Sequence, residues 1–213
     1  MEWTVDFIPS VEKEDVRLIR DTLDAFEEAR RVNGAWDSRH HIVHAQLIQP
    51  SDLPRFARLG VFANFSPLWA YADQFITELT DPYLGPERAR WQYPIGELIR
   101  GGASVVFGSD WTVSSMDPLL GIEVGVTRTD PNAEDLDPWL PEQRATLDQM
   151  LRGYTSAASR VNFLEDTTGS VEVGKAADLI VIDRDLRAIS PLQISDARVL
   201  LTMLDGEVIY RAE

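Results

Sequence analysis

The sequence predicts an α/β protein built on a parallel sheet or barrel and followed by a small β appendage. Residues 61–65 and 103–107 are apolar runs that each end at residues favouring a turn. Such short apolar runs are typical of strands buried on both faces, as in parallel sheets. Helical patterns alternate with them, which is the repeat of a parallel α/β fold. Within residues 199–210, Asp205-Gly206 separates two further apolar runs and favours a hairpin.

The first expected helix follows Ser10, which is a good N-cap residue, and ends at Gly34. One side of this segment carries apolar residues at helical spacing, namely Val16, Ile19, Leu23 and Phe26. A single apolar stripe predicts a helix with one buried face.

The elements that follow are placed by the same signals of apolar pattern, N-cap, proline and glycine. They are a strand at 39–47, a short helix from Ser51-Asp52 to Gly60, the strand 61–65, a helical segment at 97–100, the strand 103–107, a short helix after Asp117-Pro118 and a longer helix from Pro141. Residues 67–96 up to that helical segment are expected to form a long polar and aromatic loop, and residues 129–138 a second loop.

The three histidines of the chain, His40, His41 and His44, all fall in the expected strand 39–47. Alternation places His40 and His44 on one face and His41 on the other, against a helix. His40 and His44 are four residues apart, roughly 13 Å along a strand, so they cannot bind one metal ion together. His44 lies nearer the carboxyl end and is the candidate ligand, whereas His40 is expected to be a hydrogen-bonded core residue.

Asp110 directly follows the strand 103–107. An aspartate in this position often caps the next helix, which is one interpretation. However, ligands and catalytic groups of parallel α/β folds gather at the carboxyl ends of the strands. Because His44 and Asp110 each end a buried strand, we expect them to lie close together, where they could bind a hard or borderline cation.

Composition excludes several classes of protein. The 213 residues include 35 acidic and 20 basic side chains, a net charge of −15, which argues against nucleic acid or an anionic membrane as the partner. The absence of cysteine excludes disulfides and thiolate metal sites. No signal peptide or membrane-length apolar run is visible, so a cytoplasmic location is expected. No strand is followed by a glycine-rich phosphate loop, which argues against nucleotide binding.

Three motifs taken together resemble the amidohydrolase superfamily. They are Arg39-His40-x-Ile42-x-His44-Ala45-Gln46, Gly108-Ser109-Asp110-Trp111 and Gly169-Ser170-x-x-x-Gly174-Lys175-x-Ala177-Asp178-Leu179. Their order and spacing are similar to those of metal-dependent hydrolases of the N-substituted formamide deformylase type.

This resemblance implies that the chain is the C-terminal part of a (β/α)8 TIM-type barrel, about strands six to eight. Residues 1–165 would form the partial barrel and residues 166–213 a β-sandwich appendage. The resemblance assigns His44 as a metal ligand and Asp110 as both a metal ligand and the catalytic acceptor of the water proton. The metal would be a divalent ion, zinc in the complete enzyme, and the reaction hydrolysis of a non-peptide C–N bond in a small amide-type substrate.

The chain also departs from the family. The His-x-His strand, the bridging ligand and the strand-five histidine have no counterparts, and Val43 stands where the family usually has Glu. We therefore expect an incomplete barrel that is inactive alone and binds no pair of metals, associated as a homodimer or with a missing N-terminal half. The alternative is a non-catalytic structural or interaction unit that oligomerises through the open barrel edge.

Aromatic residues of the loops are candidates for a substrate pocket. Trp69 and Trp111, together with Tyr71, follow expected strands and could line an apolar cavity at the presumed active face. Packing against neighbouring loops is the equally favoured alternative.

Overall fold

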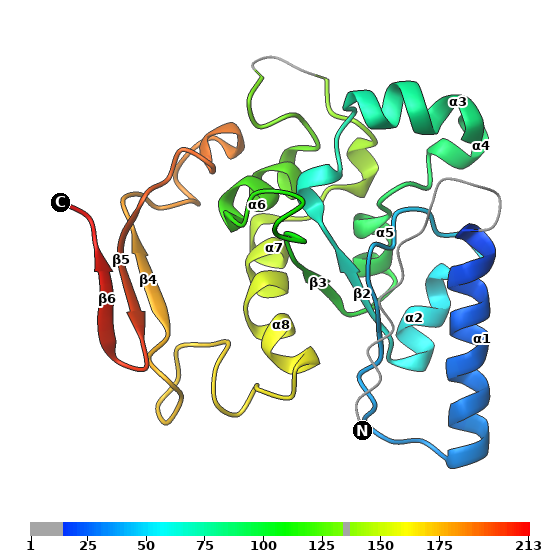
Figure 1. Cartoon of the computed structure of the whole chain (residues 1–213), viewed down its shortest axis with the longest axis horizontal. Coiled ribbons are helices and arrows are strands. Elements are labelled where there is room, and N and C mark those ends of the chain that lie inside the picture. Colours follow the sequence, from blue (N-terminus) through cyan, green and yellow to red (C-terminus); the bar gives the residue numbers. More distant parts are fainter. Residues whose placement is uncertain (1–14, 134–136) are drawn as a thin grey trace.

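The computed structural model describes residues 15–133 and 137–213 and shows two separate three-stranded sheets (Figure 1). The first sheet is parallel, in the order β1-β2-β3, and consists of β1 (His41–Ile42), β2 (Phe62–Phe65) and β3 (Val105–Phe107). Its register pairs Ile42 with Ala63 and Ala63 with Val105. The second sheet is antiparallel. The expectation of an α/β fold with a parallel sheet and a β appendage is confirmed.

Helices before and between the strands cover one side of the parallel sheet. α1 (Asp15–Asn33) precedes the sheet, α2 (Leu53–Leu59) joins β1 to β2, and α5 (Ile95–Arg100) leads into β3. The predicted stop of α2 is confirmed, because Gly60 holds a left-handed backbone and its N–H donates to the last carbonyls of the helix. The predicted Ser10 N-cap lies outside the described residues.

The segment predicted as a long loop after β2 is instead largely helical. It contains a 3-10 turn (Pro67–Trp69), a π-helix (Phe75–Thr80), α3 (Asp81–Leu84) and α4 (Pro86–Ala89). The prediction was wrong here because each helix is too short to show an apolar stripe. Proline at the first or second position starts three of the four, where its missing N–H costs no hydrogen bond.

In the described residues, β3 is followed by further helices. The helix predicted after Asp117-Pro118 is α6 (Pro118–Thr127), and Asp117 caps it by accepting a hydrogen bond from the Leu119 N–H at 2.9 Å. The helix expected from Pro141 begins later: Pro141–Gln143 is a 3-10 turn, and Thr146 forms a capping box with Gln149 at the start of α7 (Leu147–Tyr154). The helix is interrupted at Thr155, after which α8 (Ser156–Val161) begins.

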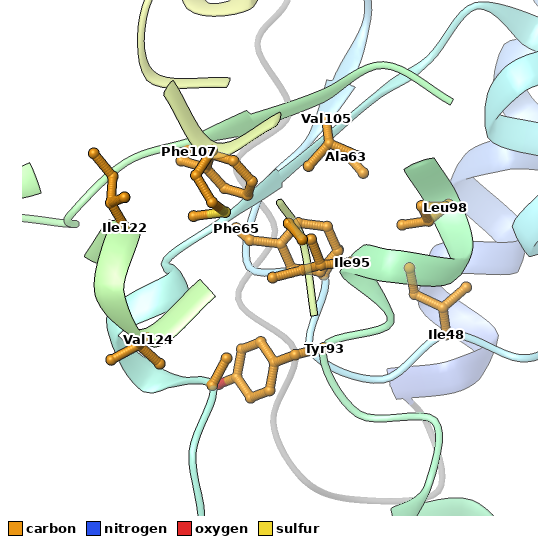
Figure 2. Close-up of a cluster of buried hydrophobic side chains, with 14 of the residues drawn as sticks. Ile48, Ala63, Phe65, Tyr93, Ile95, Leu98, Val105, Phe107, Ile122 and Val124 are labelled. Carbon is orange, nitrogen blue, oxygen red and sulfur yellow. The ribbon is translucent and has the colours of Figure 1, made fainter. Parts of the chain in front are cut away.

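The hydrophobic core lies between the parallel sheet and its helices (Figure 2). Phe65 and Phe107 extend from neighbouring strands to the same side of the sheet, and Ile95 of α5 and Ile122 of α6 pack near them. Tyr93 lies at the border of this cluster and is also buried. The core therefore fixes the strands whose carboxyl ends carry the candidate site.

The second sheet comprises β4 (Leu179–Ile182), β5 (Val199–Leu204) and β6 (Glu207–Arg211), with the predicted turn at Asp205-Gly206. The segment between β4 and β5 includes a 3-10 turn (Pro191–Gln193) and packs on the body of the chain. Its Ile194 belongs to the main core, and the N–H of Ser195 donates to the fully buried carboxylate of Glu123 in α6 at 2.7 Å. Within the described residues, no helix is long and apolar enough to cross a membrane.

Candidate active site at the carboxyl ends of the strands

A cavity of about 260 Å³ lies where the chain leaves β1, β2 and β3. The residues that line it come from these strand ends and from the segment before α5. They are His44, Gln46, Ser66, Trp69, Tyr93, Asp110 and Val113. The cavity thus lies at the edge of the sheet where parallel α/β folds bind their ligands.

His44 enters the cavity because β1 is shorter than the sequence predicts. The expected strand 39–47 ends at Ile42, and His44 adopts a positive φ of 54°. The alternation rule that placed His40 and His44 on one face therefore does not apply, since it assumes a continuous strand. The imidazole of His44 instead stacks on the indole of Trp69, with ring centroids 5.5 Å apart and an interplanar angle of 9°.

Asp110 approaches His44 from the end of β3, which is separated from β1 by β2. Its carboxylate Oδ2 lies 3.8 Å from His44 Nε2, which confirms the prediction that the two residues come close together. Asp110 also has a positive φ, 51°, a conformation that aspartate tolerates better than most residues. The N-cap of the next helix is Asp117, so capping does not account for Asp110. Backbone strain of this kind is characteristic of functional sites.

The other two histidines lie elsewhere. His40 stacks on Phe26 of α1, with centroids 4.3 Å apart, and approaches Trp36 edge-on. Burial lowers the pKa of His40, and the neighbouring His41 lowers it further. His41 lies in β1, in register with Phe62 of β2. The structure therefore brings one histidine, His44, to the cavity.

Tyr93 forms a wall of the cavity that the sequence did not reveal. Its φ is 45°, its N–H donates to the Gln46 carbonyl at 2.6 Å, and burial raises the pKa of its hydroxyl. Behind it, the guanidinium of Arg128 donates to the carbonyls of Tyr93 (3.3 Å) and Trp139 (3.1 Å). Burial lowers the pKa of Arg128 to about 9, so this side chain is still a cation at neutral pH. These contacts hold Tyr93 in its strained backbone conformation.

The aromatic candidates are placed differently from one another. Trp69 lines the cavity through its stack on His44. Trp111 is 63% exposed and is not among the cavity-lining residues, so the structure does not bring it to His44. Tyr71 packs against the hydrophobic core, and its burial raises the pKa of its hydroxyl.

The donor set at the cavity suits part of a metal site. Two ligands bound at about 2.1 Å to a tetrahedral zinc ion are about 3.4 Å apart, close to the 3.8 Å between His44 Nε2 and Asp110 Oδ2. Among residues 15–133 and 137–213, no group of three or more His, Cys, Asp or Glu side chains could hold a metal ion. One imidazole and one carboxylate therefore offer two protein ligands, whereas a catalytic zinc site has three.

A parallel sheet with an imidazole and a carboxylate at its carboxyl ends places the chain among α/β proteins that carry a ligand site at this edge. The amidohydrolase family profile matches residues 10–210, and the chain belongs to the amidohydrolase family. The resemblance seen in the sequence is thereby confirmed.

Two relatives illustrate the match. The chain is 32% identical over 189 residues to the protein LONG AFTER FAR-RED 3 of Arabidopsis thaliana, covering 88% of this chain and 31% of that protein. It is 27% identical over 189 residues to the N-substituted formamide deformylase of Arthrobacter pascens, covering 88% of this chain and 34% of the relative. The chain thus spans about a third of the length of these relatives.

Solved structures agree with this assignment. An uncharacterized metal-dependent hydrolase from Pyrococcus horikoshii OT3 superposes with a TM-score of 0.66 at 26% identity, over 83% of this chain and 34% of its own. Its counterpart from Pyrococcus furiosus gives a TM-score of 0.62 at 29% identity, over 83% and 32%.

Proposed function

We propose that the chain is the C-terminal part of an amidohydrolase (β/α)8 barrel, in which β1, β2 and β3 are strands six, seven and eight. Residues 1–165 form this partial barrel, and residues 166–213 form a β-sandwich appendage. The proposal is supported by the parallel order β1-β2-β3 and by a family match that spans both parts. Within the described residues, β3 pairs only with β2 and so leaves one edge for a further strand.

The proposed reaction is hydrolysis of a non-peptide C–N bond in a small amide-type substrate. The observation that carries it is the 3.8 Å approach of His44 Nε2 and Asp110 Oδ2 in a cavity at the carboxyl ends of the strands. Two kinds of relative support the proposal: the Arthrobacter protein is named as a deformylase of N-substituted formamides, and both Pyrococcus structures are named as metal-dependent hydrolases.

In this proposal His44 and Asp110 are two ligands of a divalent metal, zinc in the complete enzyme. The ion would supply Lewis acidity that lowers the pKa of a water molecule. Asp110 is placed to accept the proton of the attacking water and to pass it to the leaving amine. Trp69 orients the His44 ring by stacking on it. The Asp110 carboxylate is 40% exposed, which leaves it accessible to water.

Because two ligands are fewer than a catalytic zinc requires, we expect little or no hydrolysis by this chain alone. Completion of the site requires ligands from a partner, either a second copy or the N-terminal half of the barrel. A non-catalytic unit that oligomerises through a strand edge is the second candidate, and it is favoured by β3, which pairs with β2 alone among the described residues.

The test combines zinc analysis, light scattering and formate release from N-benzylformamide. The proposal predicts at most one weakly bound zinc ion per chain, an oligomer or aggregate in the absence of a partner, and no turnover above background. Two zinc equivalents in a monomer, with turnover that Asp110→Ala abolishes, would contradict the partial-barrel proposal and indicate a complete enzyme.

A further inference from the structure

Gln46 is a polar wall residue of the cavity whose backbone is fixed on both sides. Its N–H donates to the His44 carbonyl at 2.7 Å, and its carbonyl accepts from the Tyr93 N–H at 2.6 Å. The next residue, Leu47, forms an isolated antiparallel bridge with Gln92. This pairing brings the side chains of Gln46 and Gln92 together, and Gln46 Nε2 donates to Gln92 Oε1 at 2.9 Å.

The chemistry around Gln92 determines which way both amides face. The two ends of an amide are a donor and an acceptor and are hard to tell apart by shape, so the assignment must come from the partners. Gln92 is fully buried, and its Nε2 lies 2.7 Å from a carboxylate oxygen of Asp81 and 3.3 Å from the Ala89 carbonyl. Both neighbours are acceptors, so the nitrogen of Gln92 must face them.

The orientation of Gln46 follows from that of Gln92. The Gln92 oxygen is left facing Gln46 and needs a donor, which only the nitrogen of Gln46 can supply. Reversing either amide would set acceptor against acceptor at a fully buried residue, which is strongly disfavoured. The nitrogen of Gln46 is thus committed to Gln92, and its oxygen Oε1 is the end that remains for a ligand.

We propose that Gln46 Oε1 is the acceptor by which the cavity recognises a substrate N–H, so that the site selects secondary amides over tertiary amides. The proposal rests on the proposed C–N hydrolysis. In a secondary amide the nitrogen that carries the N–H is bonded directly to the carbonyl carbon that is attacked. A substrate whose carbonyl carbon lay near His44 and Asp110 would therefore place its N–H inside the same cavity, of which Gln46 forms a wall.

The test measures binding of two matched probes, N-benzylformamide, which has an N–H, and N-benzyl-N-methylformamide, which has none. Dissociation constants come from 1H–15N NMR titration of the full chain, with and without Zn²⁺. One neutral hydrogen bond corresponds to about threefold to tenfold in affinity. The wild-type chain should bind the N–H probe more tightly by this factor.

The N-methyl probe could bind more weakly either because it lacks the N–H or because its extra methyl group is bulky. Gln46→Met distinguishes these two causes, since methionine has a similar length to glutamine but no amide oxygen. It should weaken the N–H probe threefold to tenfold and leave the N-methyl probe unchanged. Gln193→Met, at an exposed glutamine outside the cavity, is the matched control and should leave both constants unchanged. An intermolecular NOE from the formamide N–H to the Gln46 γ-methylene tests the contact in the wild-type chain, without a variant.

Equal binding of both probes by the wild-type chain, an unchanged ratio in Gln46→Met, absence of that NOE in a bound complex, or no binding of N-benzylformamide would each contradict the proposal. These readouts need no turnover. A retained N–H preference together with zinc binding that neither His44→Ala nor Asp110→Asn weakens would overturn only the proposed function. Equal binding of both probes together with zinc binding that both substitutions weaken would overturn only the role of Gln46.

Discussion

Gly153 of α7 packs directly against Phe107 of β3, the strand that leads to Asp110. A Cβ atom at this position would lie 2.3 Å from Cε2 and 2.4 Å from Cδ2 of Phe107. Carbon atoms in favourable contact are about 3.5–4.0 Å apart, so the overlap exceeds about 1 Å. The Phe107 ring is buried against Tyr154, with centroids 5.4 Å apart, and cannot turn away without displacing it. Gly153→Ala should therefore push α7 away from the sheet.

The expected cost combines two opposing effects. Overpacking of a close-packed core costs about 1–3 kcal/mol. Replacing glycine by alanine in a helix returns up to about 1 kcal/mol of helix propensity. Because the overlap is with a buried ring, the upper part of the packing range, about 2–3 kcal/mol, applies here. After about 1 kcal/mol of helix propensity is subtracted, Gly153→Ala should lower the free energy of unfolding by about 1–2 kcal/mol.

Gly125→Ala in α6 is the matched control. Its Cβ would also overlap a neighbour, at 2.3 Å, but that neighbour is the terminal methyl of Met150, a flexible side chain that can adopt another rotamer. It should cost about 1 kcal/mol less than Gly153→Ala. Urea unfolding followed by far-UV circular dichroism measures both. Equal stability of the two variants, or a Gly153→Ala chain at least as stable as wild type, would refute the packing argument.

Two further predictions concern charged groups. Hydrogen bonds from the Arg184 side chain and from the Arg198 backbone N–H hold the pKa of Asp183 well below its usual 3.8. Asp183→Asn should therefore be less stable than wild type above about pH 4. Below that pH the carboxyl group of Asp183 is protonated first in the unfolded chain, so the urea midpoints of wild type and variant should converge as the pH falls. Midpoints that stay equally far apart over this pH range would contradict the prediction. Asp52 is 2% exposed and accepts hydrogen bonds from two arginines, so Asp52→Ala should cost about 2 kcal/mol in urea unfolding. Asp148→Ala, which breaks an exposed ion pair, should change stability by less than about 0.5 kcal/mol, and equal losses in both variants would contradict the burial argument.

Much of the fold could be predicted because its signals are local. The strands β2 and β3 are apolar runs between turn residues, α2 lies between Asp52 and Gly60, and the C-terminal hairpin has the turn Asp205-Gly206. Elements that depend on tertiary contacts were missed. The short helices of residues 67–89 carry no periodic apolar pattern. The sequence also does not indicate that β1 ends at Ile42, before His44.

The candidate site was predicted in the same uneven way. The proximity of His44 and Asp110 followed from one general rule, that parallel strands bring their carboxyl ends to one edge. The contribution of Gln46 did not, because it depends on an isolated bridge to Gln92, 46 residues away. Gln46 was visible in the motif His44-Ala45-Gln46, but its amide orientation is set by Asp81 and Ala89, which sequence spacing does not connect to it.

The central claim, that His44 and Asp110 together bind a divalent metal, is tested most directly by calorimetric titration of the metal-free chain with Zn²⁺. Wild type should bind one ion per chain, and His44→Ala and Asp110→Asn should each weaken binding about tenfold or more. His40→Ala, at the histidine stacked on Phe26, is the control and should bind zinc as wild type does. Zinc binding that survives both site substitutions unchanged, or that His40→Ala abolishes in a folded chain, would contradict the claim.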